Sequence, residues 1–380
     1  INTTQDAVVN QVVSEPECKE TDKEIQTDKL ILVFSNKGGV LKEVLMKDYQ
    51  NQALVKTDRA EDSIFAITGS NISRNLDTVK YDIKESRNTL TFTYDDPASQ
   101  TRVIKTYSYY PDQDFIDAII RIENISGTSQ AVNYDIVGPA GIQAATKLSD
   151  KRFIEANADL DGKFMRKTNI KNLKETFKGI VSWVALKNKY FTVAVKPPKD
   201  VDAFFIQKVG DKLLLGTTTK PVILNAGSAL EDHYRLYMGP ITSTRLKGAE
   251  MGIENIENYG IFGFISSFLL SVLRFVNSGV RNWGISIIIV TILINIVLFP
   301  LTKKSFLSMQ KMQEIQPHME KLRELHKDNP QKLNKEVMEL YRTYNVNPLG
   351  GCFQMFLQLP IFIAFYQALM HSIELKNAGF

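Results

Sequence analysis

The chain has 380 residues, of which 44% are hydrophobic and 23% are charged, and its formal net charge is +4. These averages exclude an intrinsically disordered chain, which has fewer apolar residues and a larger net charge. Two cysteines exclude a disulfide scaffold and a multi-cysteine zinc site, and four histidines leave little material for metal chemistry. We therefore expect neither a metal nor a cofactor.

Residues 1–28 form an acidic segment. They contain seven acids and two bases, with few large apolar residues. This composition predicts a flexible linker, in which Cys18 is an incidental thiol. Because the chain begins at Ile1 and stops at Phe380 just after an apolar run, we expect it to be a fragment of a longer protein.

Residues 29–250 predict a β-rich domain. Apolar residues alternate with polar ones in many short runs, and turn signals such as Gly38-Gly39 and Pro197-Pro198 separate these runs. This pattern is typical of a large antiparallel sandwich. A domain of this length buries a substantial core without disulfides.

Residues 258–278 predict an amphipathic helix. An apolar run covers 261–273, and polar side chains at Ser267, Ser271, Arg274 and Ser278 form a stripe on one helical face. A run of 13 residues is too short to span a bilayer, so we expect a helix lying in the membrane interface. A core helix of the β-rich domain is the alternative.

Two uncharged segments predict membrane-spanning helices, at 283–301 and 348–371. The first covers about 28 Å at about 1.5 Å per residue, close to the roughly 30 Å of a hydrocarbon core. Trp283 and Arg281 suit one membrane interface, and Lys303 and Lys304 suit the other. Two such segments in one chain predict a multi-pass membrane protein.

Residues 302–347 connect these two spans. The segment contains nine bases and six acids, and two apolar stripes predict an antiparallel helical hairpin. A short loop rich in Lys and Arg belongs on the cytoplasmic side, which places the β-rich domain outside, in the periplasm if the cell has one.

Motifs for enzymatic chemistry are missing from the sequence, which has no phosphate-binding glycine loop, no His-Glu-x-x-His and no Gly-x-Ser-x-Gly. We expect a protein that is not an enzyme. The informative residues are polar ones within the spans: Thr291 and Asn295 share one face of the first, and Gln354 and Gln358 share one face of the second. Spacing alone leaves two interpretations open, which are hydrogen bonding between helices and a hydrated transport or insertion surface.

Distinctive motifs lie at 282–289, 299–303, 307–312, 316–317, 347–352 and 358–362 near the spans, and at 179–185, 190–194 and 236–240 in the β-rich domain. These motifs resemble the YidC/Oxa/Alb family of membrane insertases, most closely its Gram-negative bacterial members. The resemblance is dense from about 259 to 375, and it is weaker across the β-rich domain.

This resemblance implies a periplasmic β-supersandwich, related in fold to sugar mutarotases, followed by an α-helical membrane region with a cytoplasmic hairpin. It implies a protein that inserts and helps fold inner-membrane proteins, alone or with the Sec translocon, through a hydrophilic intramembrane groove. The implied partners are nascent membrane proteins, the Sec translocon, membrane lipid, and ribosome or signal-recognition components at the hairpin, with no nucleic acid bound directly.

Carried over by position, the resemblance places Thr291, Asn295, Gln354 and Gln358 in the groove. It places a substrate slide, along which an apolar segment enters lipid, at Phe299, Leu359 and Phe362, and it gives Pro300 and Pro360 a role in shaping the helices.

One position departs from the family pattern. Members commonly have a positively charged residue in the groove, and the matching residue here is Asn295. Asparagine keeps hydrogen-bonding capacity but has no charge. We therefore expect a wet groove that attracts acidic segments less strongly.

Two other functions are alternatives for such a chain. A membrane-tethered carbohydrate-binding or carbohydrate-active β-sandwich protein would need a pocket with paired acid and base groups, and His233 is the only histidine of the domain. A small-solute transporter would have more spans and internal inverted repeats.

Overall fold

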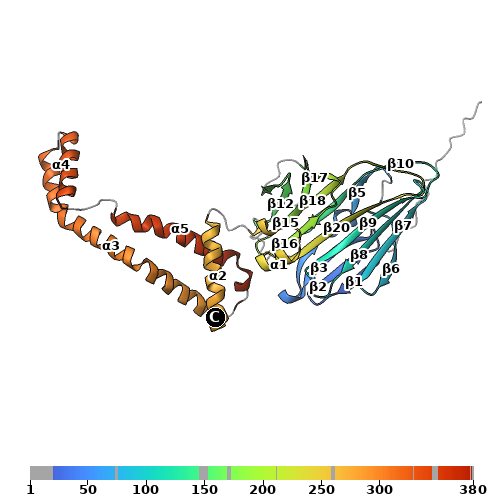
Figure 1. Ribbon diagram of the computed structural model, residues 1–380, viewed down its shortest axis with the longest axis horizontal. Helices are drawn as coiled ribbons and strands as arrows, with labels where there is room; N and C mark the ends of the chain where they lie inside the picture. Colours follow the sequence, from blue (N-terminus) through green and yellow to red (C-terminus); the bar gives the residue numbers. More distant parts are fainter. Residues whose placement is uncertain are drawn as a thin grey trace, which may run out of the picture. The chain divides into compact units, whose positions relative to one another are not determined.

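The computed structural model describes residues 20–72, 76–144, 153–168, 173–210, 212–257, 262–327, 329–344, 350–376 and 378. Side chains at 350–355 and 357 lie outside this description, as do Cys18 and residues 258–261. The chain divides into two compact units, Ile1–Glu257 and Asn258–Phe380 (Figure 1). We describe each unit by itself.

The first unit is built on a nine-stranded antiparallel sheet (Figure 1). In spatial order its strands are β13 (Lys163–Lys167), β12 (Glu155–Leu160), β15 (Val181–Lys187), β16 (Phe191–Lys196), β20 (Ala229–Pro240), β9 (Phe115–Asn124), β8 (Thr101–Tyr109), β7 (Thr89–Asp96) and β6 (Asp82–Ser86).

A five-stranded antiparallel sheet packs against it, because β11 contacts both β15 and β16. Its strands in spatial order are β14 (Lys174–Lys178), β17 (Val201–Val209), β18 (Lys212–Thr219), β11 (Tyr134–Ala140) and β5 (Ile67–Ser70). Two smaller sheets complete the strands, and they comprise β1 (Asp22–Gln26), β2 (Leu30–Ser35), β3 (Val40–Met46) and β4 (Gln52–Lys56), and β10 (Gln130–Val132) and β19 (Val222–Leu224).

Alternation along the strands decides which side chains form the core. In β8 the buried residues are Thr101, Val103, Lys105 and Tyr107, and the residues between them are only partly buried. Successive side chains of a strand point to opposite faces, so a period of two places one set between the sheets. The β-rich unit thus contains the packed antiparallel sheets that the sequence predicts.

A short segment after β20 covers one face of the nine-stranded sheet. It contains α1 (Ser243–Gly248) and η4 (Glu254–Ile256), whose Leu246 and Ile256 are buried against Trp183. Lysine and arginine side chains donate to its backbone carbonyls, including Lys187 Nζ to Ile256 O at 3.4 Å. The last residues before the helical unit are therefore packed as part of the β-rich unit.

The second unit is helical and consists of α2 (Gly263–Val280), α3 (Trp283–Leu325), α4 (Pro330–Thr343), α5 (Gly350–His371) and η5 (Ile373–Leu375). The side chain of Asn282 caps α3 by accepting from Ile285 N, and Asn329 caps α4 by accepting from Lys332 N. In the described part of the chain, α2 and α3 are long and apolar enough to cross a membrane.

One predicted boundary needs correction. The linker prediction is wrong at Asp22–Gln26, because this segment is strand β1 and pairs with β2. Its composition is polar, but Ile25 is buried and the backbone ladder supplies partners that composition does not reveal. Residues 1–19 of the predicted linker lie outside the described residues.

Helix α3 continues past the predicted end of the first span. The sequence places the end of the uncharged span at 301 and the start of the basic segment at 302, and α3 runs through this point without interruption for 43 residues, or about 65 Å. The position of the lipid boundary stays a prediction. Hydropathy changes at that point and helix formation does not, since the residues that follow are good helix formers. Pro300 and Pro317 lie inside α3, where each removes one backbone donor.

Candidate functional site

Helices α2, α3 and α5 contact one another (Figure 1). A cluster of buried side chains, Leu270, Leu273, Val290 and Ala368, lies where they meet. In Figure 1, α2 lies across the direction of α5 rather than along it. With 18 residues, α2 is longer than the 13-residue apolar run suggested and is long enough to cross a membrane, so its place in the membrane interface stays a prediction.

The outward face of α2 has two kinds of side chain. Phe264, Phe268 and Phe275 are exposed, and the predicted polar stripe is also largely exposed. Ser267 and Ser271 donate to carbonyls of their own helix. An exposed aromatic face beside small hydroxyls is typical of a helix at a membrane interface.

Polar contacts between α2 and the α5 region lie at two places. Ser266 Oγ donates to Ala364 O at 2.9 Å, and Ser266 is fully buried. Arg274 Nη2 lies 2.7 Å from Glu374 Oε1, in η5. Sequence reasoning missed Ser266 and Glu374, because nothing in the local pattern identifies their partners.

On α3, the predicted groove residues Thr291 and Asn295 are exposed and lie beside the packed face. Thr291 Oγ1 donates to Ile287 O, and Asn295 Nδ2 donates to Thr291 O, both at 2.8 Å. These bonds stay within α3. The polar stripe extends to Thr302, whose Oγ1 donates to Leu298 O and which sequence reasoning did not select.

On α5, Gln358 is exposed, whereas the side chain of Gln354 lies outside the described residues. The packed contacts between α3 and α5 involve Ile294 and Phe365. The structure thus leaves the three described groove residues open, and records no hydrogen bond that joins the amides of α3 and α5 among them.

The predicted slide residues are large, apolar and exposed. The exposed fractions are 64% for Phe299, 55% for Leu359 and 66% for Phe362. Pro300 lies directly after Phe299 inside α3, and Pro360 directly after Leu359 inside α5. Each helix therefore presents an apolar side chain next to a proline.

The far end of α3 pairs with α4 (Figure 1). Tyr341 Oη donates to Met319 Sδ at 3.1 Å, and the rings of His318 and Tyr344 are 5.8 Å apart. The turn predicted around 327–330 falls between α3 and α4, and Asp328 within it lies outside the described residues. The helical pair expected from the two stripes is thus formed.

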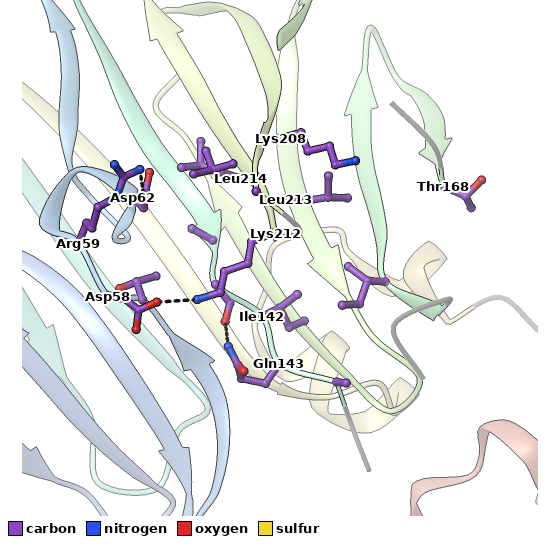
Figure 2. Close-up of a pocket in the computed structure, with 17 residues that line it drawn as sticks. Asp58, Arg59, Asp62, Ile142, Gln143, Thr168, Lys208, Lys212, Leu213 and Leu214 are labelled. Carbon is purple, nitrogen blue, oxygen red and sulfur yellow. Dashed lines mark hydrogen bonds and ion pairs between the residues drawn. The ribbon is translucent and has the colours of Figure 1, made fainter. Parts of the chain in front are cut away.

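The β-rich unit has a hollow of 720 Å³ that bears on the carbohydrate alternative. Figure 2 shows Asp58 pointing toward Lys212, with 3.2 Å between their charged atoms, and Arg59 beside Asp62. The residues described as lining the hollow include no histidine and no aromatic side chain. The carboxylates of Asp58 and Asp62 each form an ion pair, with Lys212 and Arg59, so neither is free to act on a sugar as a general acid or base.

No group of three or more His, Cys, Asp or Glu in the described ranges could hold a metal ion.

Comparisons with known proteins cover both units. The family model described as "YidC periplasmic domain" matches residues 23–272, and that described as "60Kd inner membrane protein" matches residues 275–380. The curated membrane protein insertase YidC of Geotalea daltonii is 31% identical, over 94% of this chain and 71% of that protein. The YidC of Geobacter metallireducens is 32% identical, over 94% of this chain and 70% of that protein.

Among solved structures, a galactose mutarotase related enzyme from Lactobacillus acidophilus is similar with a TM-score of 0.46 and 11% identity. It covers 57% of this chain and 97% of that chain, and a likeness of this size supports no conclusion about function. The family matches and the curated relatives are decisive. The chain belongs to the YidC family of membrane protein insertases.

Proposed function

We propose that this chain inserts proteins into the bacterial inner membrane and helps them fold, through a polar surface between α3 and α5. The observation that carries the proposal is the exposed pair Thr291 and Asn295 on a helix whose neighbouring residues are apolar. Polar side chains within a membrane span are costly unless they meet water or a partner. Their described hydrogen bonds stay within α3, which supports an open surface over hydrogen bonding between helices.

The surface acts by lowering a barrier. A charged side chain at the bilayer centre costs at least about 2.5–3.5 kcal/mol. Water held by Thr291, Asn295 and Gln358 shortens the apolar path that a translocated polar segment crosses. Burial of the substrate's own apolar helix in lipid drives the reaction, at roughly 25 cal/mol per Å². The proposed role is binding and release, with no covalent bond made or broken.

The apolar part of the substrate leaves along the exposed side chains Phe299, Leu359 and Phe362. They lie on α3 and α5, the same helices that provide the polar surface. A substrate segment can therefore move from the polar surface to lipid without leaving these two helices. Pro300 and Pro360 would bend the helices beside these residues.

Charge supports an orientation with the helical pair in the cytoplasm. Residues 302–347 have nine bases and six acids, and short basic loops stay on the cytoplasmic side. The β-rich unit then lies in the periplasm and α2 lies at the outer interface. The helical pair would meet the ribosome or signal-recognition components, and the Sec translocon would act beside the spans.

Reconstitution tests this proposal. The chain is placed in liposomes, a single-span substrate is synthesised in their presence, and protection of the substrate from protease is measured. We expect protection well above that in empty liposomes, and a loss when Thr291 and Asn295 are both replaced by leucine. Protection no better than in empty liposomes would refute the insertase role of this chain.

A further inference from the structure

A cluster of polar side chains is buried in the β-rich unit. Glu155 and Asn157 lie on β12 and Lys187 lies on β15, with exposed fractions of 6%, 2% and 9%. In the register of these strands, Glu155 lies opposite Lys187, and Asn157 lies opposite Ala185. Residues opposite one another point to the same face of a sheet, so all four side chains share one face. That face is covered by the segment 246–256, whose buried apolar side chains pack in one cluster with Ala185.

Three polar atoms of this cluster have no direct hydrogen-bond partner among the described residues. They are Nδ2 and Oδ1 of Asn157 and Oε2 of Glu155. The other oxygen of Glu155, Oε1, accepts from Arg166 Nη2 at 2.5 Å. About 90% or more of the buried polar groups in proteins are paired, and each unpaired group lowers stability. Three such atoms in one place therefore call for a partner that the side chains around them do not supply.

Lys187 faces these groups at distances that suit a bridging molecule. Its Nζ lies 4.0 Å from Glu155 Oε2, which is too far for a direct hydrogen bond. Its bond to Ile256 O is long, at 3.4 Å. Beside it, Ala185 and Ala194 lie opposite each other on β15 and β16, and their methyl groups occupy less space than longer side chains. Polar atoms held apart next to short side chains are typical of a site for buried water.

The donors and acceptors of the cluster fit water better than they fit an ion. Asn157 Oδ1 and Glu155 Oε2 accept hydrogen bonds, whereas Asn157 Nδ2 and Lys187 Nζ donate them. A metal cation would lie beside the N–H groups of Lys187 and Asn157, and an anion would lie beside the Glu155 carboxylate. A water molecule both donates and accepts, and a buried water typically forms about three hydrogen bonds.

We propose that buried water joins Asn157 and Glu155 to Lys187 and thereby holds the segment 246–256 on the nine-stranded sheet. One water donates to Glu155 Oε2 and Asn157 Oδ1 and accepts from Lys187 Nζ, and a second accepts from Asn157 Nδ2. Lys187 in turn donates to Ile256 O. Asn157 is then a positioning residue, because it acts on Ile256 through water and Lys187. The site lies within the β-rich unit and does not depend on the function proposed for α3 and α5.

An experimental map of the full chain tests the site directly. A crystal or electron-microscopy structure at a resolution that shows ordered water should have density within about 3.2 Å of both Asn157 Oδ1 and Lys187 Nζ. Well-ordered side chains of Asn157, Glu155 and Lys187 with no density between them would overturn the proposal. A direct hydrogen bond between Asn157 and Lys187 would also overturn it.

Urea unfolding of the full chain in detergent tests whether the water contributes to stability. The reporter is the fluorescence of Trp183, which belongs to the same buried cluster as Ala185, in a chain where Trp283→Phe removes the second tryptophan. Asn157→Leu removes both polar atoms of the amide at similar volume. We expect the urea midpoint to fall, because the hydrogen bonds to water are lost. A midpoint that rises would overturn the proposal, since it would mean that the amide is buried without a partner.

Asn124→Leu is the matched control for this substitution. Asn124 is also buried, and its amide has direct partners, because Nδ2 donates to Leu224 O and Oδ1 accepts from Ser126 N. Its midpoint should fall as well. Two groups that share a water are coupled, so Asn157→Leu combined with Lys187→Met should lower the midpoint by less than the sum of the two single changes. A combined fall equal to that sum would overturn the proposal.

Hydrogen exchange measures the effect on the covering segment. The amide of Ile256 donates to Ile253 O at 3.1 Å, so its exchange reports on opening of the segment at that point. In Asn157→Leu this amide should exchange about tenfold faster, the effect of losing about one hydrogen bond on an opening equilibrium. In Asn124→Leu its exchange rate should stay unchanged. Equal rates in Asn157→Leu and the unchanged chain would mean that Asn157 does not hold the segment, and would overturn the proposal.

Discussion

The buried lysine Lys105 should make the stability of the β-rich unit depend on pH. It lies in β8 and is fully buried, and its Nζ donates to Gly38 O at 2.6 Å and to Phe65 O at 2.8 Å. Burial lowers the pKa of this lysine to about 7, and the nearby Asp77 carboxylate opposes the shift only in part. A neutral amine still has two N–H donors, so both carbonyls keep their partner after the proton leaves.

The direction of the pH effect follows from this lowered pKa. Below pH 7 the folded and unfolded states both hold the proton, so Lys105 adds no slope. Above pH 7 the folded state releases it while the unfolded state, with its ordinary pKa of 10.5, keeps it. The free energy of unfolding therefore rises with pH. Its slope is about half of 1.4 kcal/mol per pH unit at pH 7 and approaches that full value well above pH 7, so the total rise between pH 7 and pH 9 is about 2 kcal/mol.

Urea unfolding of the full chain in detergent measures this effect. Trp283→Phe leaves Trp183, in β15, as the only tryptophan, so its fluorescence reports on the β-rich unit. Lys105→Met should remove about 2 kcal/mol of the rise between pH 7 and pH 9. It should also lower stability at pH 9, since each unpaired buried carbonyl costs about 1–3 kcal/mol.

Lys84→Met, at an exposed position of β6, is the control and should keep the full rise. The buried Lys187 also has a lowered pKa and contributes with the same sign, so the difference between Lys105→Met and the unchanged chain is the quantity to compare. A rise of the same size in both proteins would refute the reasoning.

Three further predictions concern the groove, the helical pair and the core. Asn295→Arg should raise insertion of substrates with acidic tails about fivefold over neutral ones, because one attraction in a hydrated site adds about 1 kcal/mol; equal gains in a protease-protection assay would contradict it. Deletion of 303–345 should reduce insertion more than deletion of 1–19, and equal tolerance would make the hairpin a mere connector. Gly216→Ala should destabilise the β-rich unit by about 1–3 kcal/mol in urea unfolding, since a Cβ there would lie 2.1 Å from Phe205 Cζ. Gly127→Ala, with nothing within 4 Å of its Cβ, should cost far less, and equal costs would exclude this explanation.

The secondary structure of periodic segments was predictable, because the pattern of buried side chains in a strand or a helix follows from the geometry of that strand or helix alone. The alternation in β8 and β9 indicates strands, and the uncharged runs indicate α3 and α5. Strand β1 was missed since Ile25 is its only buried residue, too little for a visible pattern. The sequence does not reveal that α3 continues beyond the uncharged run, because hydropathy indicates where a span leaves the lipid and not where its helix ends.

In the candidate site too, spacing along the helix identified some residues, and contacts between distant residues were not predictable. Thr291, Asn295 and Gln358 were selected from their spacing, and the structure leaves all three exposed. Ser266, Arg274 and Glu374 could not be paired in advance, because about 100 residues separate the partners in each contact. No local pattern records which distant side chain completes a hydrogen bond.

The sequence by itself determined the β-rich domain, the apolar spans, the basic loop and, through its motifs, the insertase family. These features depend on composition and on periods of two or 3.6 residues, which each segment has before it folds. Only the tertiary structure decided that Lys105 lies between two carbonyls, that Ser266 meets α5, and that Arg274 ties α2 to Glu374. The physical reason is that burial and pairing depend on neighbours brought together by folding, and these neighbours are far apart along the chain.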